Sequence, residues 1–282
     1  THVLAGFRFA TPLDADVAVA GILTFVQRRL LDIAPGFAAL ANHQASGKTT
    51  LCRVMHLVVA GRDLPVMALP SGESEEVEKS LLSILMRGPE AVCFDNVRGG
   101  INFHSRVLSQ AMTSTTFDAR VLGASKIVSC PTNVQWLMSG NNLSLGMDEA
   151  SRWLACWLVT RDHGGPEDVS AHALGLRTEA LQHMVGILAG YLTCGGRVTL
   201  PPSRFTAWDR LVRFPLVWAG GLDAAATFAA NESLGQDQQA TLQLLQAIGK
   251  AFSGREFTLS ELSRASAGVV QMDAVVRDNL RE

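Results

Sequence analysis

The chain has 282 residues and a formal net charge of −2, with 48% hydrophobic and 18% charged residues. These apolar side chains are enough for a substantial core, which excludes a wholly disordered chain. From the length we expect one large α/β domain with a smaller attachment, or about two domains. No apolar run reaches the roughly 18 residues of a membrane span, so we expect no membrane association.

The five cysteines are widely spaced, and no two of them form a C-x-x-C pair. Such spacing argues against a zinc site or a disulfide framework and is typical of a reducing cytoplasm. We find no signal-peptide pattern, so the expected location is cytoplasmic. The first residue is Thr1 rather than Met, which fits a segment of something longer.

The first part of the chain alternates between helical and strand patterns. Helices are expected over residues 13–34, 50–59, 73–86 and 103–112, and strands over 37–41, 64–69, 91–95, 134–139 and 153–160. Helix 13–34 is expected to be amphipathic, with Gln27, Arg28 and Arg29 on its polar side. Residues 120–128 predict a hairpin of two short strands around a glycine turn. Strands alternating with helices imply a parallel sheet whose faces are both covered.

The pattern changes after Gly164-Gly165-Pro166, where helices are expected over 175–193, 205–218 and 223–252. We therefore divide the chain into a core (1–165), a helical lid (166–252) and the start of a small C-terminal unit, compatible with a winged helix (253–282).

The most informative segment lies between strand 37–41 and helix 50–59. Its sequence, Asn42-His43-Gln44-Ala45-Ser46-Gly47-Lys48-Thr49, matches the P-loop pattern G-x-x-x-x-G-K-[ST] except at Asn42. In a P-loop, backbone N–H groups surround a β-phosphate at a helix N-terminus, the lysine contacts the β and γ oxygens, and the hydroxyl can ligate Mg²⁺. We therefore expect ATP and Mg²⁺ as ligands, held by residues 42–49 and Thr50. A chance G-K-T in a surface turn is the alternative, which the flanking strand and helix disfavour.

Asp95 ends the apolar strand 91–95, as a Walker B carboxylate that holds Mg²⁺ through water would do. A turn cap is the alternative. Asn96 follows, where many motor ATPases place a glutamate that activates the attacking water. An amide cannot act as a general base, so Asn96 orients water or the base comes from elsewhere. Carboxylates are available in the run Glu73, Glu75, Glu76 and Glu78, although a solvated helix face is the commoner use of such a run.

Two further polar positions follow. Asn141 or Asn142, at the tip of strand 134–139, fits a sensor-1 asparagine, with an unliganded turn as the alternative. Arg152 precedes strand 153–160 and can project to the γ-phosphate of a neighbouring subunit as an arginine finger. Its alternative is a surface arginine paired with Asp148 or Glu149.

Lys126 in the hairpin is the best candidate for contacting a nucleic-acid backbone, with Arg120 across the turn. An exposed lysine there can equally be an edge-strand gatekeeper. The slightly acidic balance argues mildly against broad nucleic-acid coating, although a ring would repeat one pore lysine per subunit. For Arg204, Arg210 and Arg213 we favour a solvated helix face over a nucleotide contact.

Taken in order, the motifs resemble a known family. They are the P-loop, an acidic helix, Phe94-Asp95-Asn96-Val97, Arg120-Val121-Leu122-Gly123, Gly140-Asn141-Asn142 and Arg152. Over about residues 10–220 this order resembles the AAA+ ATPase domain of viral superfamily 3 helicases. The resemblance is closer to the helicase portion of primase–helicase proteins of phages and mobile elements.

The resemblance implies a hexameric ring that threads single-stranded DNA by hydrolysing ATP. It implies Lys48 and Thr49 as Walker A, Asp95 as Walker B, Asn141 as sensor 1 and Arg152 as the finger in trans, with Lys126 in the region of the pore hairpin. The sequence departs from the family at Asn42, which we expect to loosen the loop turn. It departs again at Arg152, which stands alone where relatives often carry an arginine pair.

We therefore expect an α/β P-loop NTPase of the AAA+ (ASCE) type, with a parallel sheet flanked by helices and followed by a helical lid. The expected function is a replicative-type DNA helicase or translocase of a phage or mobile element. Expected partners are single-stranded or forked DNA, other copies of the chain, and a primase domain or protein. One alternative is an AAA+ switch or loader on DNA, which Asn96 favours because slow hydrolysis suits a switch. A P-loop kinase of a small molecule is the second alternative, and it would need neither a neighbour's arginine nor a pore lysine.

Overall fold

A computed structural model describes residues 2–70, 74–97, 105–121, 126–160, 168–252, 258, 260 and 261. Its centre is a five-stranded sheet in the order β2-β3-β6-β1-β7, in which every neighbouring pair is parallel. The strands are β1 (Gly36–Ala41), β2 (Val66–Met67), β3 (Ala91–Val97), β6 (Gln135–Asn141) and β7 (Trp153–Trp157). The expected parallel sheet is confirmed, and only β2 is much shorter than predicted.

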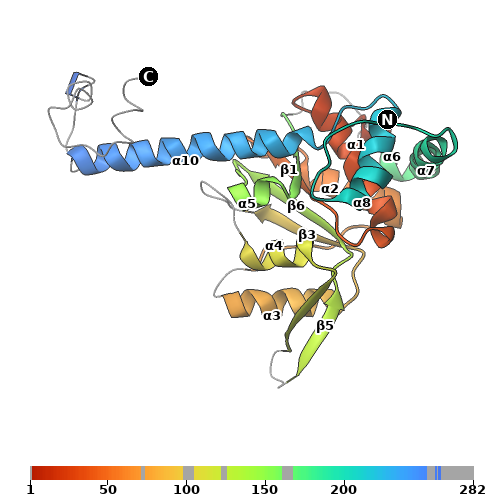
Figure 1. Ribbon diagram of the computed structural model, residues 1–282, viewed down its shortest axis with the longest axis horizontal. Coiled ribbons are helices and arrows are strands. Elements are labelled where there is room, and N and C mark those ends of the chain that lie inside the picture. The colour runs from red at the N-terminus through yellow and green to blue at the C-terminus, as the bar shows by residue number, and fades with distance from the viewer. Residues whose placement is uncertain are drawn as a thin grey trace.

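Helices cover both faces of this sheet (Figure 1). One face carries α1 (Pro12–Gln27), α2 (Lys48–Ala60), α6 (Val169–Gly175) and α7 (Arg177–Thr193). The other carries α3 (Ser74–Leu85), α4 (Arg106–Thr113) and α5 (Met147–Ala150). The start of α10 (Ala226–Phe252) contacts α5 and β7, and its Phe228 packs against the core of the first face. All six residues of β1 are buried, as expected for a parallel strand covered on both sides. The arrangement is compatible with a P-loop NTPase-like fold.

Helix α1 begins with a capping box. The Thr11 hydroxyl accepts the backbone N–H of Asp14, and the Asp14 carboxylate accepts the N–H of Thr11. The helix is not amphipathic as expected, because Gln27 and Arg28 on its predicted polar side are buried. The guanidinium of Arg28 instead donates to backbone carbonyls, including that of Val134 at 2.8 Å. A short 3-10 turn, η2 (Arg28–Leu30), follows.

The N-terminal segment protects one edge of the sheet. After a 3-10 turn, η1 (His2–Leu4), the chain pairs antiparallel with the end of β7 through a Phe9–Leu158 bridge. The N–H of Ala10 donates to the carbonyl of Trp157 at 2.9 Å. Phe7, just before this pairing, lies within van der Waals distance of the space beside Gly47.

A two-stranded antiparallel hairpin, β4 (Thr116–Arg120) and β5 (Ile127–Pro131), stands apart from the main sheet (Figure 1). The predicted hairpin is confirmed, but its strands extend further from the turn than expected. Residues 122–125 of the turn lie outside the described residues. Phe117 is buried in the core shared with α3 and α4, whereas Ile127 on the other side is 72% exposed.

The predicted helix 205–218 is divided into α8 (Thr206–Trp208), a π-helical turn η3 (Asp209–Arg213) and α9 (Phe214–Trp218). The cause lies at Pro215, which has no N–H to donate to the carbonyl of Leu211. That carbonyl accepts the Gln27 side-chain amide at 2.7 Å instead. Phe205 and Trp208 are buried in the same core as α1, so this segment is firmly attached to the sheet layer.

Several expectations fall outside the described residues. These are Glu73, Phe103, the breaker Gly164-Gly165-Pro166 with the 165/166 boundary, and nearly all of the C-terminal unit 253–282. Figure 1 shows α10 projecting well beyond the sheet. Among the described helices, none combines the length and the apolar character that crossing a membrane would require.

Candidate nucleotide-binding site

The loop 42–47 connects the carboxyl end of β1 to the first residue of α2, Lys48. Two of its residues have left-handed backbone conformations, Ala45 with φ 58° and Gly47 with φ 84°. Asn42 does not have a positive φ, so this position does not require glycine. The expected loosening of the turn by Asn42 therefore has no basis in backbone strain.

Lys48 and Ser46 both donate to one backbone carbonyl. The Lys48 ammonium lies 3.1 Å from the carbonyl oxygen of His43, and the Ser46 hydroxyl lies 2.5 Å from it. Burial lowers the pKa of Lys48, and the nearby Asp95 carboxylate opposes that shift. The loop thus places a positive charge at the N-terminus of α2, where backbone N–H groups already favour anions.

Three oxygen-bearing side chains converge next to this loop. The Thr49 hydroxyl donates to Asp95 Oδ1 at 2.6 Å, and the Ser139 hydroxyl donates to the same oxygen at 2.5 Å. Their two hydroxyl oxygens are 3.5 Å apart. The three residues come from α2, β3 and β6. They can meet because β6 lies between β3 and β1 in the sheet, and the chain passes from β1 through the loop into α2.

Ser139 was not identified from the sequence. The sequence does contain a signal for it. Ser139 is a small polar residue within an otherwise apolar run, two positions before Asn141. Side chains two residues apart on a strand point to the same side, so Ser139 and Asn141 share one face. The Ser139 hydroxyl also accepts the backbone N–H of Asn96 at 3.1 Å.

The Asp95 carboxyl is held in its charged form. Burial raises its pKa, but hydrogen bonds from Ser139 and Thr49, and from the backbone N–H of Asn96, more than offset this, and the pKa is lowered overall. Asn96 has an exposed side chain and a left-handed φ of 49°. On the acidic helix α3, Glu75 is exposed and pairs with Lys79 at 2.6 Å.

Asn141 ends β6 directly beside Ala41, the last residue of β1 before the loop. Its side-chain oxygen is buried and has no hydrogen-bond partner among the described residues. The next residue, Asn142, has φ 47° and donates its N–H to the Ala41 carbonyl at 3.1 Å. Asn141 is thus an orphaned polar group at the carboxyl edge of the sheet, where ligands bind in open α/β folds.

These groups fit a nucleoside triphosphate with Mg²⁺. Thr49 and Asp95 offer adjacent oxygen donors, the ligand type that Mg²⁺ prefers. Within the described part of the chain, no cluster of three or more His, Cys, Asp or Glu residues could hold a metal ion by itself. Mg²⁺ usually takes one or two protein ligands and completes its shell with phosphate and water.

Arg152 lies at the opposite edge of the sheet. It directly precedes Trp153, which pairs with Gly36 at the start of β1, whereas the loop begins after Ala41 at its end. At about 3.3 Å per residue the two edges are roughly 20 Å apart, beyond the reach of an arginine side chain. Arg152 therefore cannot contact a nucleotide in the loop of its own chain.

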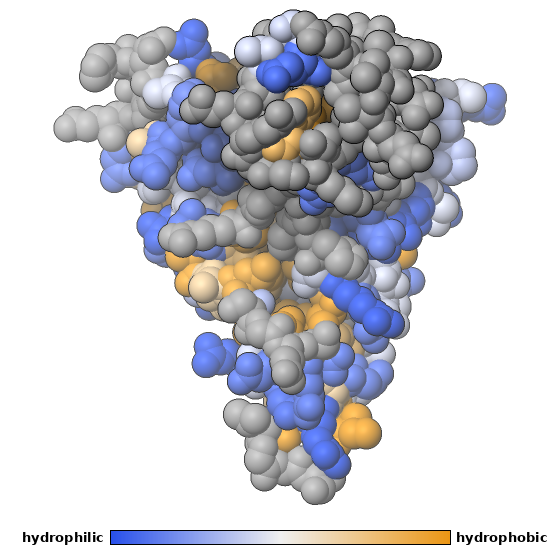
Figure 2. Space-filling model, turned by 90° about the vertical axis from the view of Figure 1, so that its left-hand side faces the viewer, coloured by the Kyte–Doolittle hydropathy of each residue, from blue (hydrophilic) through white to orange (hydrophobic). Residues whose placement is uncertain are grey.

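The remaining predicted residues lie elsewhere. Lys126 and Arg120 are exposed on the hairpin, away from the loop. Figure 2 shows this end of the molecule at the bottom, mostly hydrophilic with some hydrophobic atoms. The solvated-face interpretation fails for Arg213, which is buried and bonded to Asp209 and Asp223, whereas Arg210 is exposed.

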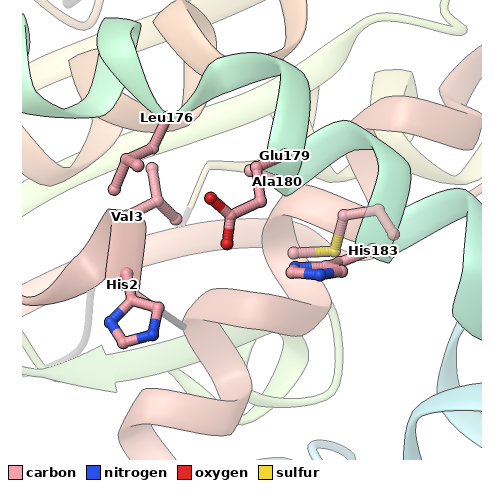
Figure 3. A pocket seen from close by; sticks show the side chains of 7 residues that line it. His2, Val3, Leu176, Glu179, Ala180 and His183 are labelled. Atoms are coloured by element: carbon pink, nitrogen blue, oxygen red, sulfur yellow. The ribbon is translucent and has the colours of Figure 1, made fainter.

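Two cavities lie on the described part of the molecule, one beside the loop 42–47 and one away from it. One, of about 410 Å³, lies between Asn42, Asn142, Trp157 and the start of α10. The other, of about 150 Å³, lies between the N-terminal turn and α7, and Figure 3 shows the carboxylate of Glu179 between the side chains that line it. The second cavity contains none of the site residues described above.

No protein-family model matches the chain, and no curated protein sequence matches it. Among solved structures, one similar chain is described as the apo A form of the NrS-1 C-terminal region, at 12% identity and a TM-score of 0.45. Another is described as the active helicase Cch of SCCmec type IV, at 10% identity and a TM-score of 0.34. The alignments cover 96% and 91% of this chain but only 61% and 52% of those chains.

Proposed function

We propose that the protein is an ATP-dependent nucleic-acid motor, a DNA helicase or translocase of the phage and mobile-element type. The observation that carries the nucleotide part is the convergence of Thr49, Asp95 and Ser139 beside the N-terminus of α2. Oxygen ligands, a lysine and helix N–H groups meet there at one edge of a parallel sheet. Phosphoryl transfer needs such positioning and charge stabilisation, and little covalent chemistry from the protein.

Each residue has a role in this proposal. The N–H groups of the loop 42–49 and of Thr50 bind the phosphates, and Lys48 neutralises the β and γ oxygens. Thr49 and Asp95 hold Mg²⁺, which supplies charge neutralisation when bound. Asn141, with its orphaned side-chain oxygen, positions water or the γ-phosphate. Asn96 contributes a backbone N–H that fixes Ser139, and its exposed amide can orient water but cannot remove a proton from it.

Support for a nucleic-acid partner comes from the hairpin. It carries Lys126 and Arg120 on exposed positions and projects away from the sheet. Lysine and arginine side chains bind nucleic-acid phosphates by neutralising their charge. We further propose a ring of copies, of hexameric type, with ATP hydrolysed between subunits. In this proposal helices α6 to α10, within residues 166–252, act as the lid, and a primase is an associated domain or protein.

A switch or loader that hydrolyses ATP slowly is the second candidate, and Asn96 in place of a glutamate favours it. A strand-displacement assay with a forked duplex separates the two functions. A motor is expected to hydrolyse ATP faster in the presence of single-stranded DNA and to separate the fork. A switch is expected to bind DNA in an ATP-dependent way without separating strands.

The controls for this assay are Lys48→Ala and Asp95→Asn. Lys48→Ala should abolish nucleotide binding, and Asp95→Asn should retain binding but lose Mg²⁺-dependent hydrolysis. If both variants bind and hydrolyse ATP like the unmodified protein, the proposed site is wrong. DNA-independent phosphorylation of a small molecule would favour a kinase instead.

A further inference from the structure

The proposed function leaves one cavity without a role, the one between the N-terminal turn η1 and helix α7 (Figure 3). Its volume is about 150 Å³. His2 and Val3 line it from η1, and the other lining residues belong to α7 or directly precede it. A protein cavity of this volume can hold a molecule the size of benzene. The space is therefore sufficient for a small organic ligand.

The floor of this cavity is apolar. It is formed by side chains of Val3, Ala180 and Met184, residues that are only 2%, 7% and 1% exposed. Ala180 and Met184 are four residues apart, so they lie on the same face of α7. Leu176, half-buried just before α7, adds to this wall. An apolar group placed against these side chains would be removed from water, which favours binding.

Three polar side chains complete the lining. Glu179 and His183 are also four residues apart on α7, and His2 belongs to η1 on the other side of the cavity. In Figure 3 the Glu179 carboxylate lies between the imidazoles of His2 and His183. Arg177, on the same helix, donates from Nη2 to the carbonyl of Val59 at 3.0 Å instead of pairing with Glu179. Among the described residues, none of the three polar side chains has a hydrogen-bond or ion-pair partner.

The chemistry of these three groups selects a cation that donates hydrogen bonds. A carboxylate accepts through two oxygens, and a neutral imidazole offers one acceptor nitrogen. A primary ammonium group carries one positive charge and three N–H donors, so it can bond to all three side chains at once. An anion would be repelled by Glu179. A metal ion is a poorer match, because no three His, Cys, Asp or Glu residues in the described part of the chain are placed to hold one.

We propose that this cavity binds a small primary amine. The ammonium group is bonded to Glu179, His2 and His183, and the apolar body of the amine lies on the buried floor. This ligand is neither a nucleotide nor a nucleic acid, so its site is separate from that of the proposed function. A bound amine would hold η1 against α7, two segments from distant parts of the sequence.

Benzylamine is the probe, because its ring is the size of benzene and its ammonium group has three donors. Isothermal titration calorimetry of the whole protein at pH 8, which favours neutral imidazoles, should show saturable binding to one site per chain. Two analogues separate the contributions. Benzyl alcohol lacks the charge, and N,N-dimethylbenzylamine keeps the charge but has a single donor. Each should bind roughly tenfold more weakly than benzylamine, the loss expected when hydrogen bonds to a charged group are removed.

Variants assign the binding to this cavity. Glu179→Gln should weaken benzylamine binding roughly tenfold or more. Glu76→Gln is the matched control and should bind normally, because Glu76 is likewise an exposed third residue of a helix, α3. His183→Leu keeps a wall but removes an acceptor, so it should weaken the binding of benzylamine more than that of benzyl alcohol. Circular dichroism and melting curves check that each variant is folded.

Several results would overturn the inference. These are the absence of saturable binding to the unmodified protein, equal affinity for benzylamine and benzyl alcohol, and unchanged benzylamine affinity in Glu179→Gln. Competition by Zn²⁺ that His183→Leu abolishes would also count against it, and would assign the three side chains to a metal. The titration contains no nucleotide or DNA, and Lys48→Ala should bind benzylamine normally. The inference can therefore fail while the proposed function stands, and the reverse also holds.

Discussion

Ser139 and Asp95 are joined by a 2.5 Å hydrogen bond that ties β6 to β3 at the carboxyl edge of the sheet. The same serine hydroxyl accepts the N–H of Asn96 at 3.1 Å, so one side chain is bonded to two consecutive residues near the end of β3. Ser139 thus acts on the candidate metal ligand by positioning it.

Replacing Ser139 with Ala should therefore weaken Mg²⁺ dependence more than nucleotide binding. Loss of one hydrogen bond to a charged group typically costs about 1.5–3 kcal/mol, or roughly 10-fold or more in affinity. We expect the Mg²⁺ concentration for half-maximal hydrolysis to rise accordingly, with nucleotide affinity in EDTA unchanged. Ser139→Thr keeps the hydroxyl and serves as the control. An unchanged Mg²⁺ requirement in Ser139→Ala would show that Asp95 is positioned without it.

The lowered pKa of Asp95 predicts a pH dependence of stability. Because the folded-state pKa lies below the unfolded value of about 3.9, the contribution is fully present above that value. It is lost as the pH falls through the folded-state pKa. Denaturation of the unmodified protein and of Asp95→Asn should therefore differ by a constant amount near neutral pH, and by less in acid. A difference that stays constant down to about pH 2 would contradict the lowered pKa.

The two ends of the loop should differ in how much nucleotide affinity depends on glycine. Glycine should make little difference at position 42, whereas at position 47 it should be needed. Asn42→Gly should leave nucleotide affinity within about twofold, because Asn42 has no left-handed strain to relieve. Gly47→Ala should lower the affinity at least tenfold, since φ 84° disfavours any side chain and the loop must shift. Titration of a fluorescent ATP analogue measures both. Equal losses in the two variants would show that the backbone conformation of the loop is not what matters.

The hairpin gives an independent prediction for nucleic-acid binding. Lys126→Ala and Arg120→Ala should each weaken single-stranded DNA binding and reduce the slope of log K against log salt by about 0.7. ATP affinity should not change, because the hairpin is not part of the nucleotide site. Arg87→Ala, in the exposed turn just after α3, is the matched control. Unchanged DNA affinity in both hairpin variants would leave Lys126 as an edge-strand gatekeeper.

Arg213 should matter for stability rather than for chemistry. Its guanidinium is buried and bonded to Asp209 at 3.1 Å and to Asp223 at 2.7 Å. Removing it with Arg213→Ala leaves the buried Asp209 without its cation, which typically costs about 3–5 kcal/mol. Urea denaturation should show this loss, whereas Arg210→Ala, an exposed neighbour, should change stability by no more than about 0.5 kcal/mol. Comparable losses would mean that the ion pair contributes little.

The sequence predicted the sheet well because its strands are short apolar runs bounded by glycine or polar residues. The edges of elements were less predictable. The predicted helix 205–218 is helical over 206–218, but five of its residues form a π-helical turn. Pro215 lacks the N–H that would bond the Leu211 carbonyl, and that carbonyl accepts the amide of Gln27, which is far away in the sequence. The burial of Arg28 likewise depends on distant carbonyls that no local pattern reveals.

The candidate site was predictable where a motif carries it and not where tertiary contacts do. Lys48, Thr49 and Asp95 follow from loop and strand patterns, and the fold brings them together. Ser139 was missed because a single serine within an apolar strand has no periodic signature. The hydrogen bond that Arg204 donates to the hydroxyl of Ser151, next to Arg152, was missed because it depends on how the segment before α8 packs, which begins with the burial of Phe205.

The loop 42–47 and Arg152 lie at opposite ends of the parallel strands. This placement restricts the symmetry of any assembly in which the loop of one copy contacts Arg152 of another. A contact that joins them pairs two different surfaces, and such a heterologous contact lacks two-fold symmetry. Repetition of that contact either closes into a ring or continues as a helical filament. The direction of the strands would then become the direction of the assembly, so that every copy gives one edge to the neighbour ahead and the other to the neighbour behind.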